Sequence, residues 1–216
     1  MAEMDEQRNR LTLKLVYYGP ALSGKTTNLT RLHDLLGAEL IGDMMTLETE
    51  GDRTLFFDLL PLGFTAPSGL LLKFKVFTVP GQVAHDGTRK AVLSRADGIV
   101  FVADSQRDQA LNNGASFDNL MANVGTLGMD VTTLPLVVQF NKRDLHNVLS
   151  EQEIRQRWAN APWPLLFASA LEGSGVIETF STLLGNVYDR LDAEFSLAAA
   201  HRLPREAFVN AAGGRA

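Results

Sequence analysis

A phosphate-loop motif near the N-terminus constrains the fold of this chain more than any other feature. Leu11–Tyr18 alternates in the manner of a strand, and Gly19-Pro-Ala-Leu-Ser-Gly-Lys25-Thr26 follows it and fits G-x-x-x-x-G-K-S/T. Leucines on one helical face come next, within residues 26–36. Such a loop turns backbone N–H groups toward an anion at the positive end of a helix. We expect Lys25 to reach the β- and γ-phosphates of a nucleotide and Thr26 to bind Mg²⁺. A glycine-rich turn that matches by chance is the alternative, and the flanking strand and helix argue against it.

Apolar runs alternate with helix-like segments along the rest of the chain. Leu70–Val79 alternates lysine with apolar residues and predicts a strand with one wetter face. Ile99–Ala103, Leu136–Phe140 and the shorter Leu165–Ala168 are continuous apolar runs, typical of central parallel strands. Helices are predicted between these runs, over about residues 84–94, 113–126, 150–160 and 174–193. This order predicts an α/β fold, a single doubly wound P-loop NTPase domain with a mixed, mostly parallel central sheet.

Composition excludes several other classes of protein. The chain has 216 residues and a formal net charge of −5, so it can bury a large core and is a poor candidate for general nucleic-acid binding. It contains no cysteine, which removes disulfides, thiolate metal sites, prenylation and palmitoylation. Residue 2 is Ala2, so myristoylation is not expected, and no apolar run is long enough for a membrane span. We expect a cytoplasmic protein with no direct membrane anchor and no nucleic-acid partner.

A second motif directly follows the apolar run that ends at residue 140. Asn141-Lys142-Arg143-Asp144 fits N-K-x-D at a strand end, where open α/β sheets bind ligands. A carboxylate such as Asp144 can accept hydrogen bonds from the ring N–H and the exocyclic amine of guanine, a donor pair that adenine lacks. Asn141 and Lys142 would brace the base pocket. Alone, these residues could be a surface charge cluster, but with the phosphate loop upstream they predict a guanine nucleotide.

Two further segments could act on the terminal phosphate. In the Pro-Gly81-Gln82 turn after the third predicted strand, the Gly81 N–H could bind that phosphate and Gln82 could orient the attacking water. In the segment 50–58, Thr54 could hold Mg²⁺ and the γ-phosphate, and Arg53 could neutralise transition-state charge. From residue chemistry alone, an ion pair of Arg53 with a neighbouring carboxylate on a solvated loop is the better explanation.

The order of these motifs resembles that of Ras-like small GTPases and, more closely, that of the bacterial MglA group. The resemblance covers about residues 11–195 and rests on five blocks of sequence. They are YYGPALSGKTTN (17–28), LETEGDRTLFFDLLP (47–61), FTVPGQV (77–83), ADGIVFVADSQ (96–106) and QFNKRDL (139–145).

The resemblance implies a GTP/GDP switch that binds Mg²⁺ and hydrolyses GTP slowly. It implies acceleration by a Roadblock/LC7-type dimer, MglB, a role in cell polarity or gliding motility, unidentified effectors of the GTP state and recruitment to a cell pole in that state. It places Thr78 where most Ras-like proteins carry the aspartate of D-x-x-G, and it implies that residues 56–62 move between nucleotide states.

Residue roles are implied by the same resemblance. The catalytic residues are Arg53, as an internal arginine finger, and Gln82, which positions water. The metal ligands are Thr26 and Thr54. The nucleotide-binding residues are Gly19, Ala21, Leu22, Ser23, Gly24, Lys25, Thr26, Thr27, Thr54, Gly81, Asn141, Lys142, Asp144, Ser169, Ala170 and Leu171.

Two features depart from the family pattern. Ala21 stands where the family usually has glycine, and its Cβ predicts slower turnover without loss of binding. The chain also continues past residue 195, where typical members stop. We expect residues 1–10 to be a flexible N-terminus, residues 11–195 to be a Ras-like G domain, and residues 196–216 to be disordered or a short helix that adds nothing to the core.

Two other functions are alternatives to a hydrolysing switch. Ala21 favours a GTP-binding interaction module with little or no turnover. An ATP-dependent kinase could use the same phosphate loop, but Asp144 and the Pro-Gly-Gln turn argue against it. In the absence of an activator we expect a monomer.

Overall fold

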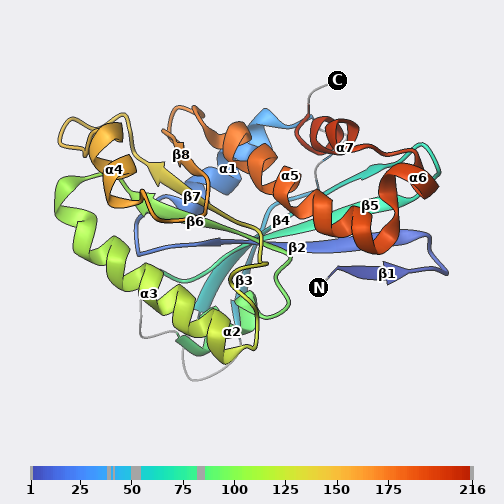
Figure 1. Ribbon diagram of the computed structural model, residues 1–216, viewed down its shortest axis with the longest axis horizontal. Coiled ribbons are helices and arrows are strands. Elements are labelled where there is room, and N and C mark those ends of the chain that lie inside the picture. The colour runs from blue at the N-terminus through green and yellow to red at the C-terminus, as the bar shows by residue number, and fades with distance from the viewer. Residues whose placement is uncertain (1, 38–39, 41, 50–54, 82–85, 215–216) are drawn as a thin grey trace.

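The central sheet of the computed structural model, which describes residues 2–37, 40, 42–49, 55–81 and 86–214, is mixed and mostly parallel (Figure 1). The described strands are β1 (Glu3–Asp5), β2 (Arg10–Tyr18), β3 (Met45–Thr49), β4 (Leu55–Thr65), β5 (Leu71–Thr78), β6 (Gly98–Asp104), β7 (Leu136–Asn141) and β8 (Leu165–Phe167). They lie in the order β3-β4-β5-β2-β6-β7-β8, with β1 beside β2. The strands from β5 to β8 in this order pair in parallel, whereas β1, β3 and β4 pair antiparallel with their neighbours. The predicted α/β fold class is confirmed.

Helices cover both faces of this sheet (Figure 1). One face carries α1 (Lys25–Leu35), α5 (Val176–Phe195), α6 (Leu197–His201) and α7 (Arg205–Ala212). The other carries α2 (Asp86–Leu93), α3 (Ala110–Thr126) and α4 (Glu151–Arg157), and a short 3₁₀ helix, η3 (Arg107–Gln109), precedes α3. Because side chains alternate along a strand, β2 supplies both cores: Leu13 and Leu15 pack toward the first set of helices, and Val16 and Tyr18 toward the second. Within the described ranges, none of the helices combines the length and the apolar character that crossing a bilayer requires.

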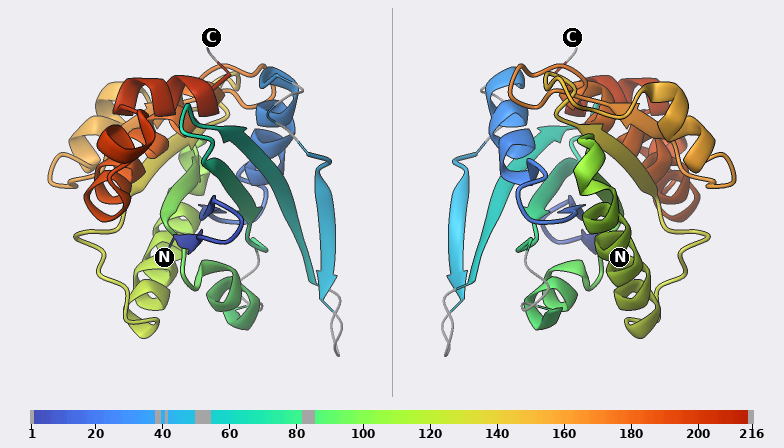
Figure 2. Two further views of the ribbon diagram at one scale, coloured as in Figure 1. Left: turned by 90° about the vertical axis from the view of Figure 1, so that its right-hand side faces the viewer. Right: turned by 90° about the vertical axis from the view of Figure 1, so that its left-hand side faces the viewer.

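The hairpin of β3 and β4 is the larger of two parts of the sheet that the sequence did not predict. It forms one edge of the sheet, with Thr46 opposite Asp58, and β4 continues antiparallel beside β5 (Figure 2). The strand β4 contains Asp58, Pro61 and Gly63, three residue types that are depleted in strands. Local preference therefore gave no strand signal here, and pairing with β3 and β5 decides the conformation.

The described residues near both ends of the chain form more structure than the sequence predicted. Residues Glu3–Asp5, expected to be flexible, pair antiparallel with β2. At the other end, α6 and α7 follow α5, and Leu197, Leu203 and Phe208 are fully buried or nearly so. The expectation that the tail adds nothing to the core is therefore corrected for its described part. The apolar residues of this segment are sparse among alanines, so their periodicity was too weak to predict the packing.

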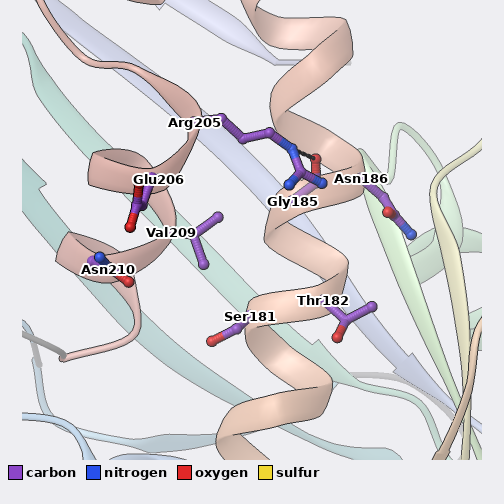
Figure 3. Close-up of a pocket in the computed structure, with 8 residues that line it drawn as sticks. All are labelled: Ser181, Thr182, Gly185, Asn186, Arg205, Glu206, Val209 and Asn210. Carbon is purple, nitrogen blue, oxygen red and sulfur yellow. Dashed lines mark hydrogen bonds between the residues drawn. The ribbon is translucent and has the colours of Figure 1, made fainter.

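Polar contacts also attach α7 to α5. A groove of about 580 Å³ separates the two helices, and Arg205 reaches across it (Figure 3). Its Nε donates to the carbonyl oxygen of Gly185 at 3.2 Å and lies 3.3 Å from a carboxylate oxygen of Asp189. The tail is thus fixed by a buried apolar side and by an exposed ion pair.

Candidate functional site

The phosphate loop connects the end of β2 to the start of α1. Gly19 and Gly24 have φ angles of 150° and 95°. A Cβ at Gly19 would overlap the carbonyl oxygen of Val102, and one at Gly24 would overlap the Asn141 amide nitrogen. Leu22 is also left-handed, with φ at 62°, and its side chain is 88% exposed. The motif therefore folds into a tight turn against β6 and β7, at the N-terminus of an eleven-residue helix.

Lys25 is buried inside this loop. Its Nζ donates to the carbonyl oxygens of Gly19 at 3.1 Å and Pro20 at 2.7 Å. Burial and, to a smaller extent, the charge of Arg89 lower the pKa of Lys25 to about 7, although the charge of Asp58 acts in the opposite direction. Because an ammonium group has three donors, one is left for a ligand after the two bonds to carbonyl oxygens.

The chemistry of the loop fits a nucleoside polyphosphate with Mg²⁺. The Ser23 hydroxyl is buried, 3.1 Å from where a Cβ of Gly19 would lie, and has no hydrogen-bond partner among the residues that the structure describes. Phosphate oxygens accept from hydroxyl, ammonium and N–H groups, and the Thr26 hydroxyl at the start of α1 is a hard oxygen ligand suited to Mg²⁺. Thr27, half-buried in the same turn of α1, completes the predicted set on this element.

Asn141 joins three of the predicted segments. Its side-chain amide donates to the Ser23 carbonyl oxygen at 2.9 Å, and its Oδ1 accepts from the Ala170 N–H at 2.8 Å. The phosphate loop, the N-K-x-D segment and the Ser-Ala-Leu segment after β8 are therefore neighbours at the carboxyl ends of the parallel strands, where ligands bind in such sheets.

The other residues of the predicted base pocket are held by polar contacts. Asp144 accepts a hydrogen bond from the Ser169 hydroxyl at 2.7 Å. Lys142, at a φ of 67°, donates from Nζ to the buried carboxylate of Asp104 at 2.7 Å. Leu171 is 64% exposed, and its carbonyl oxygen accepts two hydrogen bonds from one arginine of α1. These contacts fix the side chains whose chemistry suggested guanine.

The Pro-Gly turn after β5 lies directly against the phosphate loop. A Cβ at Gly81 would overlap the Ala21 Cα and lie 2.6 Å from the Ala21 nitrogen, so only glycine fits at this position. Arg89 of α2, fully buried, holds the turn: its Nε donates to the Pro80 carbonyl oxygen at 2.9 Å and one Nη donates to that of Gly81. Its other Nη donates to Asn119 of α3 at 2.7 Å, so the turn is tied to two helices.

Comparisons with known proteins identify the family. Mutual gliding-motility protein MglA of Myxococcus xanthus is 42% identical to this chain over 183 residues, which are 85% of this chain and 94% of that protein. The chain belongs to the MglA group of small GTPases. The model of the ADP-ribosylation factor (Arf) family matches residues 68–187. Human ADP-ribosylation factor-like protein 4A is 27% identical over 179 residues, 78% of this chain and 80% of that protein. As an MglA-type protein the chain is a small GTPase, and guanine nucleotide with Mg²⁺ is the ligand class that its loop fits.

Three predicted residues of the MglA-type site lie outside the described residues. They are the proposed arginine finger Arg53, the metal ligand Thr54 and the water-positioning Gln82. Their roles stay predictions. Gly81, which precedes Gln82 in the sequence, is held by Arg89 against the phosphate loop.

Sequence reasoning missed two residues of this MglA-type site. Arg89 gave no signal, because one arginine in an amphipathic helix is usually a solvated residue. Asp58 gave a signal that the sequence analysis did not use. It is the only charged residue in the otherwise apolar run from Phe57 to Leu62. Its carboxylate accepts a hydrogen bond from the Thr26 hydroxyl at 2.6 Å.

Proposed function

We propose that this protein is a GTP/GDP switch that binds its nucleotide with Mg²⁺ and hydrolyses GTP slowly. The observation that carries the proposal is Asn141, whose amide holds together the phosphate loop and the two segments expected to contact the base. A site of this construction positions phosphates and base with one rigid set of contacts, which is what a nucleotide switch needs.

Some residues of the site are expected to bind the nucleotide and Mg²⁺, and others to promote hydrolysis. Lys25 would neutralise charge on the β- and γ-phosphates, and Thr26 and Thr54 would hold Mg²⁺, which supplies further charge neutralisation when bound. Gln82 would orient the attacking water, and Arg53 would offset charge that develops in the transition state. Arg89 supports this arrangement from outside the reacting atoms, because it holds the turn that precedes Gln82.

Activation and cellular role are proposed from the relationship to MglA. We infer that a Roadblock/LC7-type dimer resembling MglB accelerates hydrolysis, and that the protein regulates cell polarity or gliding motility from the cytoplasm, with recruitment to a pole in the GTP state. The family name of the relative and the five matching blocks of sequence support this inference. An arginine finger contributes about 10³–10⁵ to the hydrolysis rate. Intrinsic turnover is therefore expected to be slow until the activator directs Arg53 inward.

Single-turnover hydrolysis tests the proposal. The purified protein with Mg²⁺ should convert GTP to GDP and leave ATP untouched, and the activator should raise the rate. Arg53→Ala should keep GTP affinity and lose most of the stimulated rate, whereas Arg8→Ala, on a side chain 72% exposed, serves as the control. Equal stimulated rates for Arg53→Ala and the unsubstituted protein would refute the role of Arg53. Equal loss of ATP and GTP would refute the guanine assignment.

Contact between Ala21 and Gly81 favours a second candidate function, a GTP-binding module with little turnover. The Ala21 methyl carbon lies 2.9 Å from where a Cβ of Gly81 would be, so it touches the turn that leads to Gln82. A methyl group there takes up space beside Gly81, the residue that precedes Gln82 in the sequence. Ala21→Gly should then raise the stimulated rate of hydrolysis. An unchanged rate would show that Ala21 has no effect on turnover.

A further inference from the structure

Asp58 is a buried carboxylate with three hydroxyl partners from three different elements. It lies in β4 and is 8% exposed. Its Oδ2 accepts hydrogen bonds from Thr26 of α1 at 2.6 Å and Thr78 of β5 at 2.9 Å, and its Oδ1 accepts one from Thr46 of β3 at 3.2 Å. The shortest of these bonds goes to the hydroxyl that the phosphate loop offers to Mg²⁺.

This carboxylate has no salt bridge with a lysine or arginine in the part of the chain that the structure describes. Burying a carboxylate is energetically costly, and neutral hydroxyl groups offset that cost only in part. The positive charge of Lys25 is near enough for Asp58 to raise the pKa of that lysine, against the larger effect of burial. A cation bound at the Thr26 hydroxyl would add positive charge to that of Lys25 and would compensate the negative charge of Asp58 more fully.

Thr78 fixes the direction in which the carboxylate points. Its hydroxyl accepts the Asp58 N–H at 2.9 Å and donates to Asp58 Oδ2 at 2.9 Å. Thr78 stands where the D-x-x-G pattern has its aspartate. Here the side chain at position 78 carries no charge and instead orients a carboxylate from the adjacent strand.

We propose that Asp58 is the positioning residue for Mg²⁺ in this protein, acting through the Thr26 hydroxyl. A hydroxyl that donates its proton to a carboxylate keeps its oxygen lone pairs for a metal, and the negative charge makes that oxygen a stronger ligand. Asp58 thereby does from β4 what an aspartate at position 78 would do from β5. The inference rests on the proposed Mg²⁺–nucleotide function.

The negative charge of Asp58 predicts that its removal affects GDP release differently with and without Mg²⁺. Without Mg²⁺, a carboxylate beside the phosphates repels them, so Asp58→Asn should leave GDP release unchanged or make it slower. With Mg²⁺, the same substitution weakens the ligand and should make release faster. A purely structural role would raise the release rate under both conditions.

The experiment measures release of a fluorescent GDP analogue from the full chain, in excess EDTA and over a range of free Mg²⁺. Asp58→Asn should raise the Mg²⁺ concentration that gives half-maximal slowing by about 10–100-fold, the usual effect of removing a second-shell partner. Thr46→Val removes the hydroxyl on the other carboxylate oxygen and is the matched control, expected to stay near the unsubstituted midpoint. Asp58→Asn combined with Thr78→Asp returns a carboxylate from β5 and should recover part of the shift.

Each result decides one point. An unchanged Mg²⁺ midpoint in Asp58→Asn, or faster release in EDTA by the same factor as in Mg²⁺, would overturn the inference. Failure of the double substitution to recover any of the shift would overturn the equivalence of positions 58 and 78. If the unsubstituted protein binds no GDP, or releases it at a rate insensitive to Mg²⁺, it is the proposed function that fails.

Discussion

Replacing Phe208 by alanine should strongly destabilise the protein, although this residue lies in the tail beyond the predicted domain. Phe208 is fully buried, and its ring centroid lies 5.3 Å from that of Tyr188, 5.8 Å from Phe74 and 6.1 Å from Phe64. Truncation of a buried phenylalanine typically costs about 3–5 kcal/mol, and three ring contacts place this residue toward the upper end. Small domains are stable by about 5–15 kcal/mol, so the loss is a large fraction of the total.

Urea unfolding followed by the intrinsic fluorescence of the two tryptophans measures this loss. GDP and Mg²⁺ must be held at fixed saturating concentrations, because a ligand that binds only the folded state raises the apparent stability. Glu206→Ala, exposed on the same helix, is the control and should change the free energy of unfolding by less than about 0.5 kcal/mol. A loss below about 1 kcal/mol for Phe208→Ala would show that α7 does not pack on the sheet as described, and would refute the reasoning.

Two further predictions concern the site. In Arg89→Lys, the lysine cannot bind both the Pro80 and the Gly81 carbonyl oxygens while it also reaches α3. Activator-stimulated GTP hydrolysis should therefore fall by about tenfold or more, while GDP affinity is retained. An unchanged single-turnover rate would contradict this. In the nucleotide-free protein the pKa of Lys25 is about 7, below its ordinary value of 10.5. Between pH 7 and pH 10.5, Lys25 is therefore protonated in the unfolded chain and mostly neutral in the folded protein. The free energy of unfolding should therefore rise with pH by up to ~1.4 kcal/mol per unit across this window, and Lys25→Met should abolish that rise. Parallel pH profiles for the two proteins in urea would disprove it.

The parallel part of the sheet could be predicted because burial on both faces leaves a plain signal. Leu136–Phe140 is apolar at nearly every position, and the structure makes it a strand covered on both sides. The β3–β4 hairpin has no such signal, since Pro61 and Gly63 oppose a strand locally and pairing with β5 overrides them. The packing of the tail helices on the core escaped prediction for a related reason: the aromatic cluster around Phe208 forms only in three dimensions.

The nucleotide-binding motifs could be predicted because each is contiguous in sequence and carries its own chemistry. The phosphate loop needs only Gly19 to Thr26, and N-K-x-D needs only four residues. Asp58 and Arg89 differ, because their roles depend on partners far away in the chain. The Asp58 partners are 12, 20 and 32 residues distant. No local pattern encodes such contacts, and only the charge of Asp58 within an apolar run hinted at one.

The register of β4 against β5 links the fold to the chemistry of the site. Leu59 pairs with Phe77, which places the preceding residue, Asp58, beside Thr78 and within reach of Thr26. A slip of one residue would turn Asp58 to the opposite face of the sheet. A slip of two would keep the face but carry the carboxylate about 7 Å along the strand, beyond hydrogen-bond range of Thr26. If this segment moves between nucleotide states, as the family resemblance implies, then movement of the hairpin and the strength of Mg²⁺ binding cannot be independent of one another.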